Sequence, residues 1–248
     1  MHKFYLSIIH EKEFRIFVNW GQFLVWRQEH GGMAKGFENI TDAISWLCKK
    51  GIKVTKEDFP RYLFDSEPYV FEPTIRTHEK PIVGENEIAV YTDGACLCNP
   101  NGPGGFSAVM LLPDGREAMV SGYEFSTTNN RMEIMAAIAG LDWLSRETSC
   151  QGKQVTLWTD SKYLRNVFAK DWITRWKKNG WKTIKGTNVL NKDLLELLDW
   201  LVHITKVTFM WQNGHSGNHF NEKADMIAGK QAKFAAARGG FSTKGVLT

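Results

Sequence analysis

The sequence has only four cysteines among its 248 residues, and none of them forms a Cys-x-x-Cys pair. Cys96 and Cys98 are too close for a comfortable disulfide and lack the spacing of a zinc knuckle, which argues against a disulfide framework or a structural zinc site. No apolar run approaches the roughly 18–20 residues that a membrane-spanning helix needs. The amino-terminal segment is too interrupted by charge for a signal peptide. These absences favour a reduced cytoplasmic protein that is not embedded in a membrane.

Internal repeats and low-complexity tracts are also lacking, while an apolar content of 43% is enough for a packed core. One change of composition divides the chain. Residues 72–87 combine two prolines, a glycine, scattered charge and few apolar side chains, which is typical of a linker. We therefore expect a small domain at 1–71, a linker at 72–87, a larger domain at 88–237 and a flexible tail at 238–248.

The pattern of apolar residues predicts the fold class of each part. Two short strands, 3–9 and 15–18, followed by a helix at 39–47, predict a small α+β domain at the amino terminus. In the larger domain we expect helices at 131–144, after Asp160, at 194–203 and at 221–235, and strands at 88–91, 106–112, 117–125, 154–159 and 206–211. This order predicts an α/β domain with a mixed five-stranded sheet flanked by helices.

Four carboxylates stand in apolar surroundings within the larger domain. Asp93 and Asp160 each follow an apolar strand, Glu133 lies in the first turn of a helix, and Asp225 lies in the last helix. Taken singly, each has the ordinary alternative of a turn or helix-capping role, and spacing alone does not show that the four converge. If they do converge, their repulsion needs neutralisation, and Mg²⁺ with its preference for oxygen ligands is suited to that.

Positive charge is concentrated in one segment. Residues 165–186 hold seven basic side chains and one acid, Asp171, for a net charge of +6, whereas the whole chain carries only +4. Trp172, Trp176 and Trp181 interleave with the basic residues. Such a segment is suited to phosphates and to sugars or bases, although packing of the tryptophans into a core is the alternative.

These motifs, in their order, resemble type 1 ribonuclease H. The resemblance covers about residues 88–237 without a large gap. Its motifs in this sequence are Tyr91-Thr92-Asp93-Gly94-Ala95-Cys96, Asn99-Pro100 with Gly102-Pro103-Gly104-Gly105, Thr127-Thr128-Asn129-Asn130-Arg131-Met132-Glu133, Thr159-Asp160-Ser161, Gly214-His215-Ser216-Gly217 and Asn221-Glu222-Lys223-Ala224-Asp225.

The resemblance implies a monomeric endonuclease that cuts the RNA strand of an RNA–DNA hybrid and leaves 5′-phosphate and 3′-hydroxyl ends. Asp93, Glu133, Asp160 and Asp225 would hold two Mg²⁺ ions, with Mn²⁺ as an alternative, and His215 on a loop would assist proton transfer or product release. The implied substrate contacts are Cys96, Asn99, Thr128, Asn129, Asn130, Trp172, Trp176, Lys177, Lys178, Trp181, Lys182 and Asn191.

The amino-terminal segment resembles the small hybrid-binding (viroplasmin-type) domain that accompanies many of these enzymes. The matching stretches are Phe4-Tyr5, Asn19-Trp20 and Gly31-Gly32-Met33-Ala34-Lys35-Gly36-Phe37. The resemblance implies hybrid binding through Tyr5, Trp20, Lys35 and Phe37, and a module that contacts a protein instead is the alternative. For the whole chain, two alternatives are weighed: another nuclease of the same fold, such as a transposase, integrase or junction resolvase, and a non-catalytic hybrid-binding protein.

Overall fold

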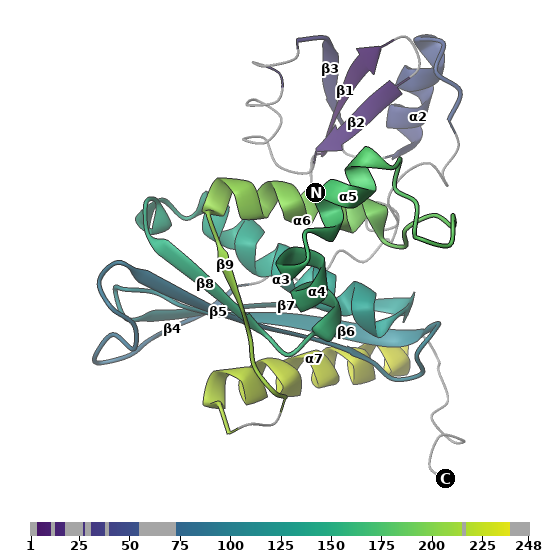
Figure 1. Cartoon of the computed structure of the whole chain (residues 1–248). Coiled ribbons are helices and arrows are strands. Elements are labelled where there is room, and N and C mark those ends of the chain that lie inside the picture. The colour runs from purple at the N-terminus through teal and green to yellow at the C-terminus, as the bar shows by residue number, and fades with distance from the viewer. Residues whose placement is uncertain are drawn as a thin grey trace. The chain divides into compact units, whose positions relative to one another are not determined.

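The structure, a computed structural model, describes residues 4–10, 13–17, 27, 31–37, 40–54, 73–214 and 217–238. The chain divides into two compact units, Met1–Pro68 and Tyr69–Thr248 (Figure 1). Each unit has its own sheet, and each is described by itself below.

The first unit contains a three-stranded antiparallel sheet and one helix. Its strands are β1 (Phe4–His10), β2 (Glu13–Phe17) and β3 (Met33–Phe37) in the order β2-β1-β3, and α2 spans Ile40–Lys49. The sheet and the helix share a small core of Leu6, Ile8, Phe37, Ala43, Leu47 and Ile52. The expected α+β class is therefore confirmed. The strand β3 was not expected, because only two strands were predicted before the helix.

The second unit is built on a mixed sheet of six strands in the order β4-β7-β6-β5-β8-β9. The strands are β4 (Thr74–Thr77), β5 (Glu87–Cys96), β6 (Gly102–Leu111), β7 (Arg116–Thr127), β8 (Gln154–Thr159) and β9 (Thr208–Trp211). The pairs β5–β8 and β8–β9 are parallel, and the other neighbours are antiparallel. Every residue of β6 is buried, as expected for a central strand covered on both faces.

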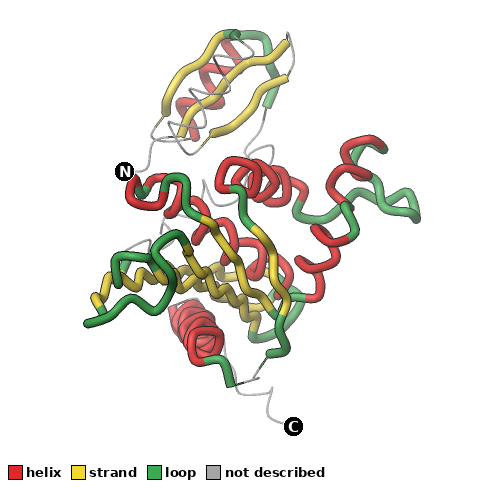
Figure 2. Tube along the Cα trace, turned by 60° about the vertical axis from the view of Figure 1, so that its left-hand side comes forward, coloured by secondary structure: helices red, strands yellow, loops and turns green. Residues whose placement is uncertain are grey.

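Helices cover both faces of this sheet. They are α3 (Asn129–Arg146), α4 (Lys162–Ala169), α5 (Trp172–Lys178), α6 (Lys192–Thr205) and α7 (His219–Arg238), with a short 3₁₀ turn η3 at Thr148–Cys150. Figures 1 and 2 show α7 alone on one face and α3 with α6 on the other. Gly105 in β6 allows α7 to pass closely, since a Cβ there would lie 2.3 Å from the carbonyl oxygen of Ala228.

The sheet has one strand more than the five expected. Strand β4 comes from the span interpreted as a linker, and it pairs antiparallel with β7. His78, just after β4, donates its backbone N–H to the Gly115 carbonyl at 2.9 Å and contacts Glu117 through its ring. All four residues of β4 are exposed, so its low apolar content is explained by its position at the sheet edge. Composition alone does not distinguish such an edge strand from a linker.

Candidate active site

The parallel pairing of β5 with β8 brings Asp93 and Asp160 to the same part of the sheet. Thr92 is the register partner of Thr159, so each aspartate lies one residue beyond this pair. Asp93 lies within β5, and Asp160 directly follows β8. The register therefore brings these two carboxylates to adjacent positions of a parallel strand pair. Both side chains are half-buried.

The environment of Asp93 favours its protonated form. Burial, followed by the negative charges of Asp160 and Asp225, raises its pKa from 3.8 to about 8. The Gly94 N–H donates to Asp93 Oδ1 at 2.7 Å and opposes this shift without cancelling it. The repulsion shows that carboxylates from β5, from the residue after β8 and from α7 share one region. A cation there would relieve the same repulsion.

Glu133 reaches the region from α3. The helix begins at Asn129, so Glu133 is its fifth residue and lies just beyond the first turn in which it was expected. Burial raises its pKa from 4.5 to about 7, and the charge of Asp160 adds to the shift. The Asn129 amide donates to one Glu133 oxygen at 2.9 Å, and the Ser161 hydroxyl donates to the other. A glycine at position 94 makes this approach of α3 feasible, because a Cβ there would lie 2.3 Å from the Glu133 backbone nitrogen. The glycine after Asp93 is therefore required by packing.

Ser161 is a site residue to which the sequence pattern gave no role. Its Oγ donates to Glu133 and also accepts from the Leu164 N–H at 3.2 Å, so it caps α4. The same hydroxyl thus links the start of α4 to a carboxylate on α3. Its position directly after Asp160 in the Thr-Asp-Ser motif was the available signal.

The carboxylates supply the oxygen donors that a hard divalent cation prefers. Within the ranges that the structure describes, no group of three or more His, Cys, Asp or Glu side chains is placed so that it could hold a metal ion as a cage. Mg²⁺ does not require such a cage, because it is commonly held by one or two carboxylates, with waters and substrate phosphates completing its shell. The donor chemistry and the mutual repulsion around Asp93 therefore fit a divalent cation.

The expected RNA-contacting residues gather beside the carboxylates, around the β5–β6 loop and the start of α3. The Asn129 N–H donates to Asn99 Oδ1 at 3.1 Å, which joins the loop to the helix. The Cys96 thiol contacts the carbonyl oxygens of Gly102 and Thr127 at 3.6 and 3.5 Å, and burial raises its pKa. Thr128 caps α3 by accepting from the Arg131 N–H, and Asn130 is exposed.

A family model for RNase H matches residues 85–233, which is more than half of the chain. The chain belongs to the RNase H family. The resemblance to type 1 ribonuclease H is therefore confirmed, and so is its classification as an enzyme. Members of the family generally depend on a divalent metal. The match begins at residue 85, so the hybrid-binding resemblance of the amino-terminal unit stays a prediction.

Two curated proteins illustrate the similarity. A Ribonuclease H from Francisella philomiragia is 48% identical over 146 residues, which are 59% of this chain and 91% of that protein. A Ribonuclease H from Syntrophus aciditrophicus is 45% identical over 148 residues, which are 60% of this chain and 82% of that protein. Both relatives are therefore matched over most of their length by the second unit of this chain.

A solved structure agrees with the family. The crystal structure of LC9-RNase H1, described as a type 1 RNase H with the type 2 active-site motif, is 27% identical with a TM-score of 0.50. The match covers 64% of this chain and 84% of that chain. The α/β class expected from the sequence is thus confirmed for this member of the RNase H family.

The basic segment of this RNase H, residues 165–186, runs from the middle of α4 through α5 into the loop that follows it. The ring centroids of Trp172 and Trp176 are 5.6 Å apart, and those of Trp176 and Trp181 are 6.1 Å apart. Trp181 is buried, with 8% of its surface exposed, so its ring packs in this cluster and is not displayed to a base. Trp172 and Trp176 are half-buried, with the remaining surface open to a ligand.

The polar residues of the same segment are mostly exposed. Lys178 and Lys182 are exposed, and Lys182 donates to the Asn188 side chain at 2.5 Å. Lys177 forms an ion pair with Asp199 of α6 at 2.5 Å, which offsets part of its charge. Asn191 has a left-handed backbone (φ 57°) directly before α6. The segment therefore presents net positive charge above an aromatic cluster.

Several expected site residues lie elsewhere or outside the described residues. His215 and Trp20 fall outside the ranges that the structure describes. In the first unit, Phe37 is buried against Trp46 and belongs to the core, whereas Tyr5 is half-buried and Lys35 is exposed. Phe37 is thus poorly placed to stack on a sugar.

Among the described helices, none is both long and apolar enough to cross a bilayer.

Proposed function

We propose that this chain hydrolyses the RNA strand of RNA–DNA hybrids with two Mg²⁺ ions held by Asp93, Glu133, Asp160 and Asp225, leaving 5′-phosphate and 3′-hydroxyl ends. The observation that carries the proposal is the gathering of Asp93, Asp160 and Asp225 within a family-matched fold, where burial and the charges of the other two raise the pKa of Asp93 to about 8. Carboxylates that repel one another in a partly buried site are costly, and a divalent cation removes that cost. Mn²⁺ would substitute for Mg²⁺ because both accept oxygen donors.

The residues of the site have separable tasks in this proposal. Bound metal would polarise the scissile phosphate and lower the pKa of a water nucleophile. Asn129 and Ser161 orient Glu133 by donating to its two oxygens, and the Gly94 N–H holds one oxygen of Asp93. His215, four residues before α7 begins in the sequence, would accept or donate a proton as products leave.

Recognition of the substrate would come from the surfaces that flank the carboxylates. Cys96, Asn99, Asn129 and Asn130 would contact the minor groove, where the 2′-hydroxyl distinguishes RNA from DNA. Thr128 and Asn191 would hold a phosphate of the DNA strand. The basic residues of α5 and its following loop would contact the backbone electrostatically, with Trp172 and Trp176 as partial stacking surfaces.

A substrate panel tests the proposal. The purified chain with Mg²⁺ is incubated with an end-labelled RNA–DNA hybrid, duplex DNA, duplex RNA and a DNA duplex carrying one ribonucleotide. We expect cleavage of the hybrid RNA strand, with 5′-phosphate and 3′-hydroxyl ends, and loss of cleavage in EDTA. Equal cleavage of duplex DNA would favour another nuclease of this fold, and binding without cleavage would favour a non-catalytic hybrid-binding protein.

For the amino-terminal unit we infer a tether for the hybrid. Removing residues 1–71 leaves β4 in the sheet, because this strand begins at Thr74. We expect the shortened chain to bind hybrid about tenfold more weakly, with kcat nearly unchanged, because a tether raises local substrate concentration without altering the chemistry. Fluorescence anisotropy in Ca²⁺ measures the binding, and initial rates measure kcat. Unchanged affinity would exclude the tether and leave a protein-contacting role.

We further propose that the chain acts as a monomer in the cytoplasm. The four cysteines are free thiols, which suits a reducing compartment. Sedimentation in the presence and absence of hybrid would test the oligomeric state.

A further inference from the structure

Asp160 is held at its main chain by a hydrogen bond from a neighbouring strand. It follows the last paired residue of β8, so the sheet ladder no longer fixes its carbonyl group. The indole N–H of Trp211 donates to that carbonyl oxygen at 3.1 Å. Trp211 is the last residue of β9 and the register partner of Thr159, which places it directly beside the end of β8.

This hydrogen bond fixes the peptide unit that joins Asp160 to Ser161. The rotation of that peptide decides where the Asp160 carboxylate points and where the Ser161 hydroxyl lies. Ser161 in turn donates to Glu133. The Trp211 indole N–H therefore influences two of the four carboxylates. It acts on Asp160 through the backbone of that residue and on Glu133 through the Ser161 hydroxyl.

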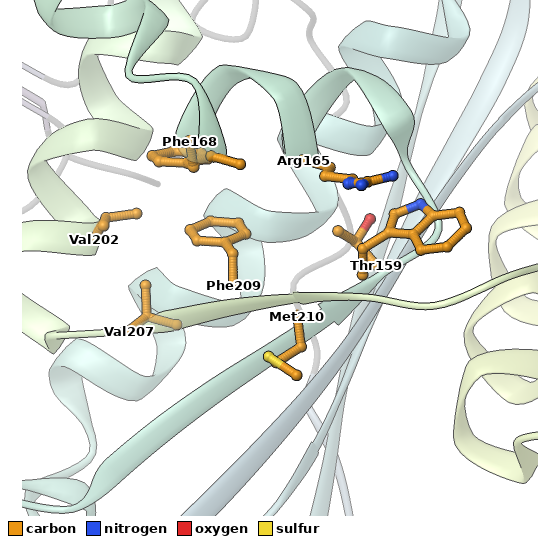
Figure 3. A pocket seen from close by; sticks show the side chains of 9 residues that line it. Thr159, Arg165, Phe168, Val202, Val207, Phe209 and Met210 are labelled. Atoms are coloured by element: carbon orange, nitrogen blue, oxygen red, sulfur yellow. The ribbon is translucent and has the colours of Figure 1, made fainter.

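Close packing alone does not fix the Trp211 ring. A cavity of about 290 Å³ lies between α4, α6 and β9, and Trp211, Thr159 and Arg165 are among its lining residues. Figure 3 shows Phe168 of α4 facing Phe209 of β9, with Arg165 farther along the same wall. The Arg165 guanidinium lies 4.9 Å from the centroid of the Trp211 ring, on its face. The ring is thus oriented by this cation–π contact and by its hydrogen bond, with open space on the cavity side.

The residues that follow Trp211 also lie close to Thr159 and Asp160. The Gln212 N–H donates to the Thr159 carbonyl at 3.1 Å. Gly214 lies so close that a Cβ there would be 2.6 Å from Asp160 Oδ2. The 211–214 segment therefore borders Asp160 at both its carbonyl and its carboxylate.

We propose that Trp211 is a positioning residue for the metal-binding carboxylates, acting through the Asp160 carbonyl. This inference rests on the proposed function, in which Asp160 holds metal. Groups that orient metal ligands typically contribute 10–100-fold to metal affinity or activity. Trp211 is expected to act on metal affinity and kcat, and not on affinity for the hybrid.

The test compares Trp211→Phe, which keeps an aromatic ring but loses the N–H, with Trp158→Phe. Trp158 is a matched control because it is half-buried in neighbouring β8 and stacks on Tyr91, with ring centroids 6.4 Å apart. Calorimetry measures Mg²⁺ binding to each protein without substrate. We expect Mg²⁺ affinity about tenfold weaker for Trp211→Phe and unchanged for Trp158→Phe. Cleavage assays should give a lower kcat for Trp211→Phe with an unchanged KM for hybrid.

A second measurement on the unaltered protein applies even if Trp211→Phe does not fold. In ¹H–¹⁵N spectra, the Trp211 indole resonance should shift as Mg²⁺ is added, and the Trp158 indole should not. Wild-type Mg²⁺ affinity in a folded Trp211→Phe protein, or an indole resonance that ignores saturating Mg²⁺, would overturn the positioning role. The proposed function is tested independently of this role. Cleavage of hybrid by the unaltered chain would support it, and absence of cleavage would contradict it.

Discussion

Asp160→Asn is expected to lower kcat for hybrid cleavage by at least about a thousandfold while leaving hybrid affinity within a few-fold. The asparagine keeps the size of the side chain but removes the negative charge that a divalent cation would require. The hydrogen bond from the Trp211 indole N–H would persist in this variant, because its acceptor is the backbone carbonyl of residue 160. Single-turnover cleavage in Mg²⁺ measures the rate, and fluorescence anisotropy in EDTA measures affinity without metal.

Asp114→Asn provides the matched control for this prediction. It makes the same chemical change in the turn between β6 and β7, where Asp114 pairs with Arg116. We expect its cleavage rate to stay within about twofold of the unaltered chain, since a surface ion pair contributes little. Near-normal turnover by Asp160→Asn would refute the assignment of this residue as a metal ligand.

Asp93→Asn should make the metal-free protein more stable at neutral and mildly alkaline pH. Below about pH 3 the aspartate is protonated in both the folded and the unfolded chain, so the substitution changes little. As pH rises, the unfolded chain loses this proton near 3.8, whereas the folded chain keeps it to about 8. The folded state of the unaltered protein therefore loses stability across this window, and the neutral asparagine avoids the loss.

The size of this effect is bounded by the pKa shift. A shift of one unit corresponds to about 1.4 kcal/mol, but relaxation and coupling among the carboxylates reduce the total. We expect the free energy of unfolding at pH 8 to rise by about 2–3 kcal/mol, and the melting temperature by about 5–10 °C. Thermal unfolding in EDTA between pH 3.5 and 8.5 measures the difference, which should grow with pH.

Asp114→Asn is again the control for the pH prediction, and we expect it to change the free energy of unfolding in the opposite direction. Partial burial raises the pKa of Asp114, but hydrogen bonds from Arg116 and its charge outweigh this and leave the pKa below its ordinary value. Its substitution should therefore remove a small stabilisation at neutral pH. If Asp93→Asn is no more stable than the unaltered chain at pH 8, the carboxylates do not repel one another as described. A gain in stability with a loss of activity is typical of residues selected for function.

The second unit could be predicted well from sequence because its signals are local. Strands and helices followed the periodicity of apolar residues, and four of the six strands were expected within a few residues of their bounds. The order of short motifs predicted Asp93, Glu133, Asp160 and Asp225 as site residues, although each alone resembles a common cap or turn residue. The pairing of β5 with β8 places Asp93 and Asp160 at adjacent positions.

The features missed from sequence depend on partners distant in the chain. Strand β4 has few apolar residues, and only its pairing with β7 makes it part of the sheet. Phe37 was interpreted as a binding aromatic, but its packing on Trp46 places it in the core. Trp181 likewise proved to be buried within the aromatic cluster. An aromatic residue in a polar stretch has the same local pattern whether it packs inward or contacts a ligand.

The sequence by itself determined the family, the α/β class and the identity of the acidic residues, because these reside in residue types and their order. Only the tertiary structure decided how those acids influence one another. Burial and the approach of Asp160 and Asp225 raise the pKa of Asp93, and these are properties of distance and dielectric. The contacts of Ser161 with Glu133 and of Trp211 with the Asp160 carbonyl were decided in the same way, since they join segments 28 and 51 residues apart.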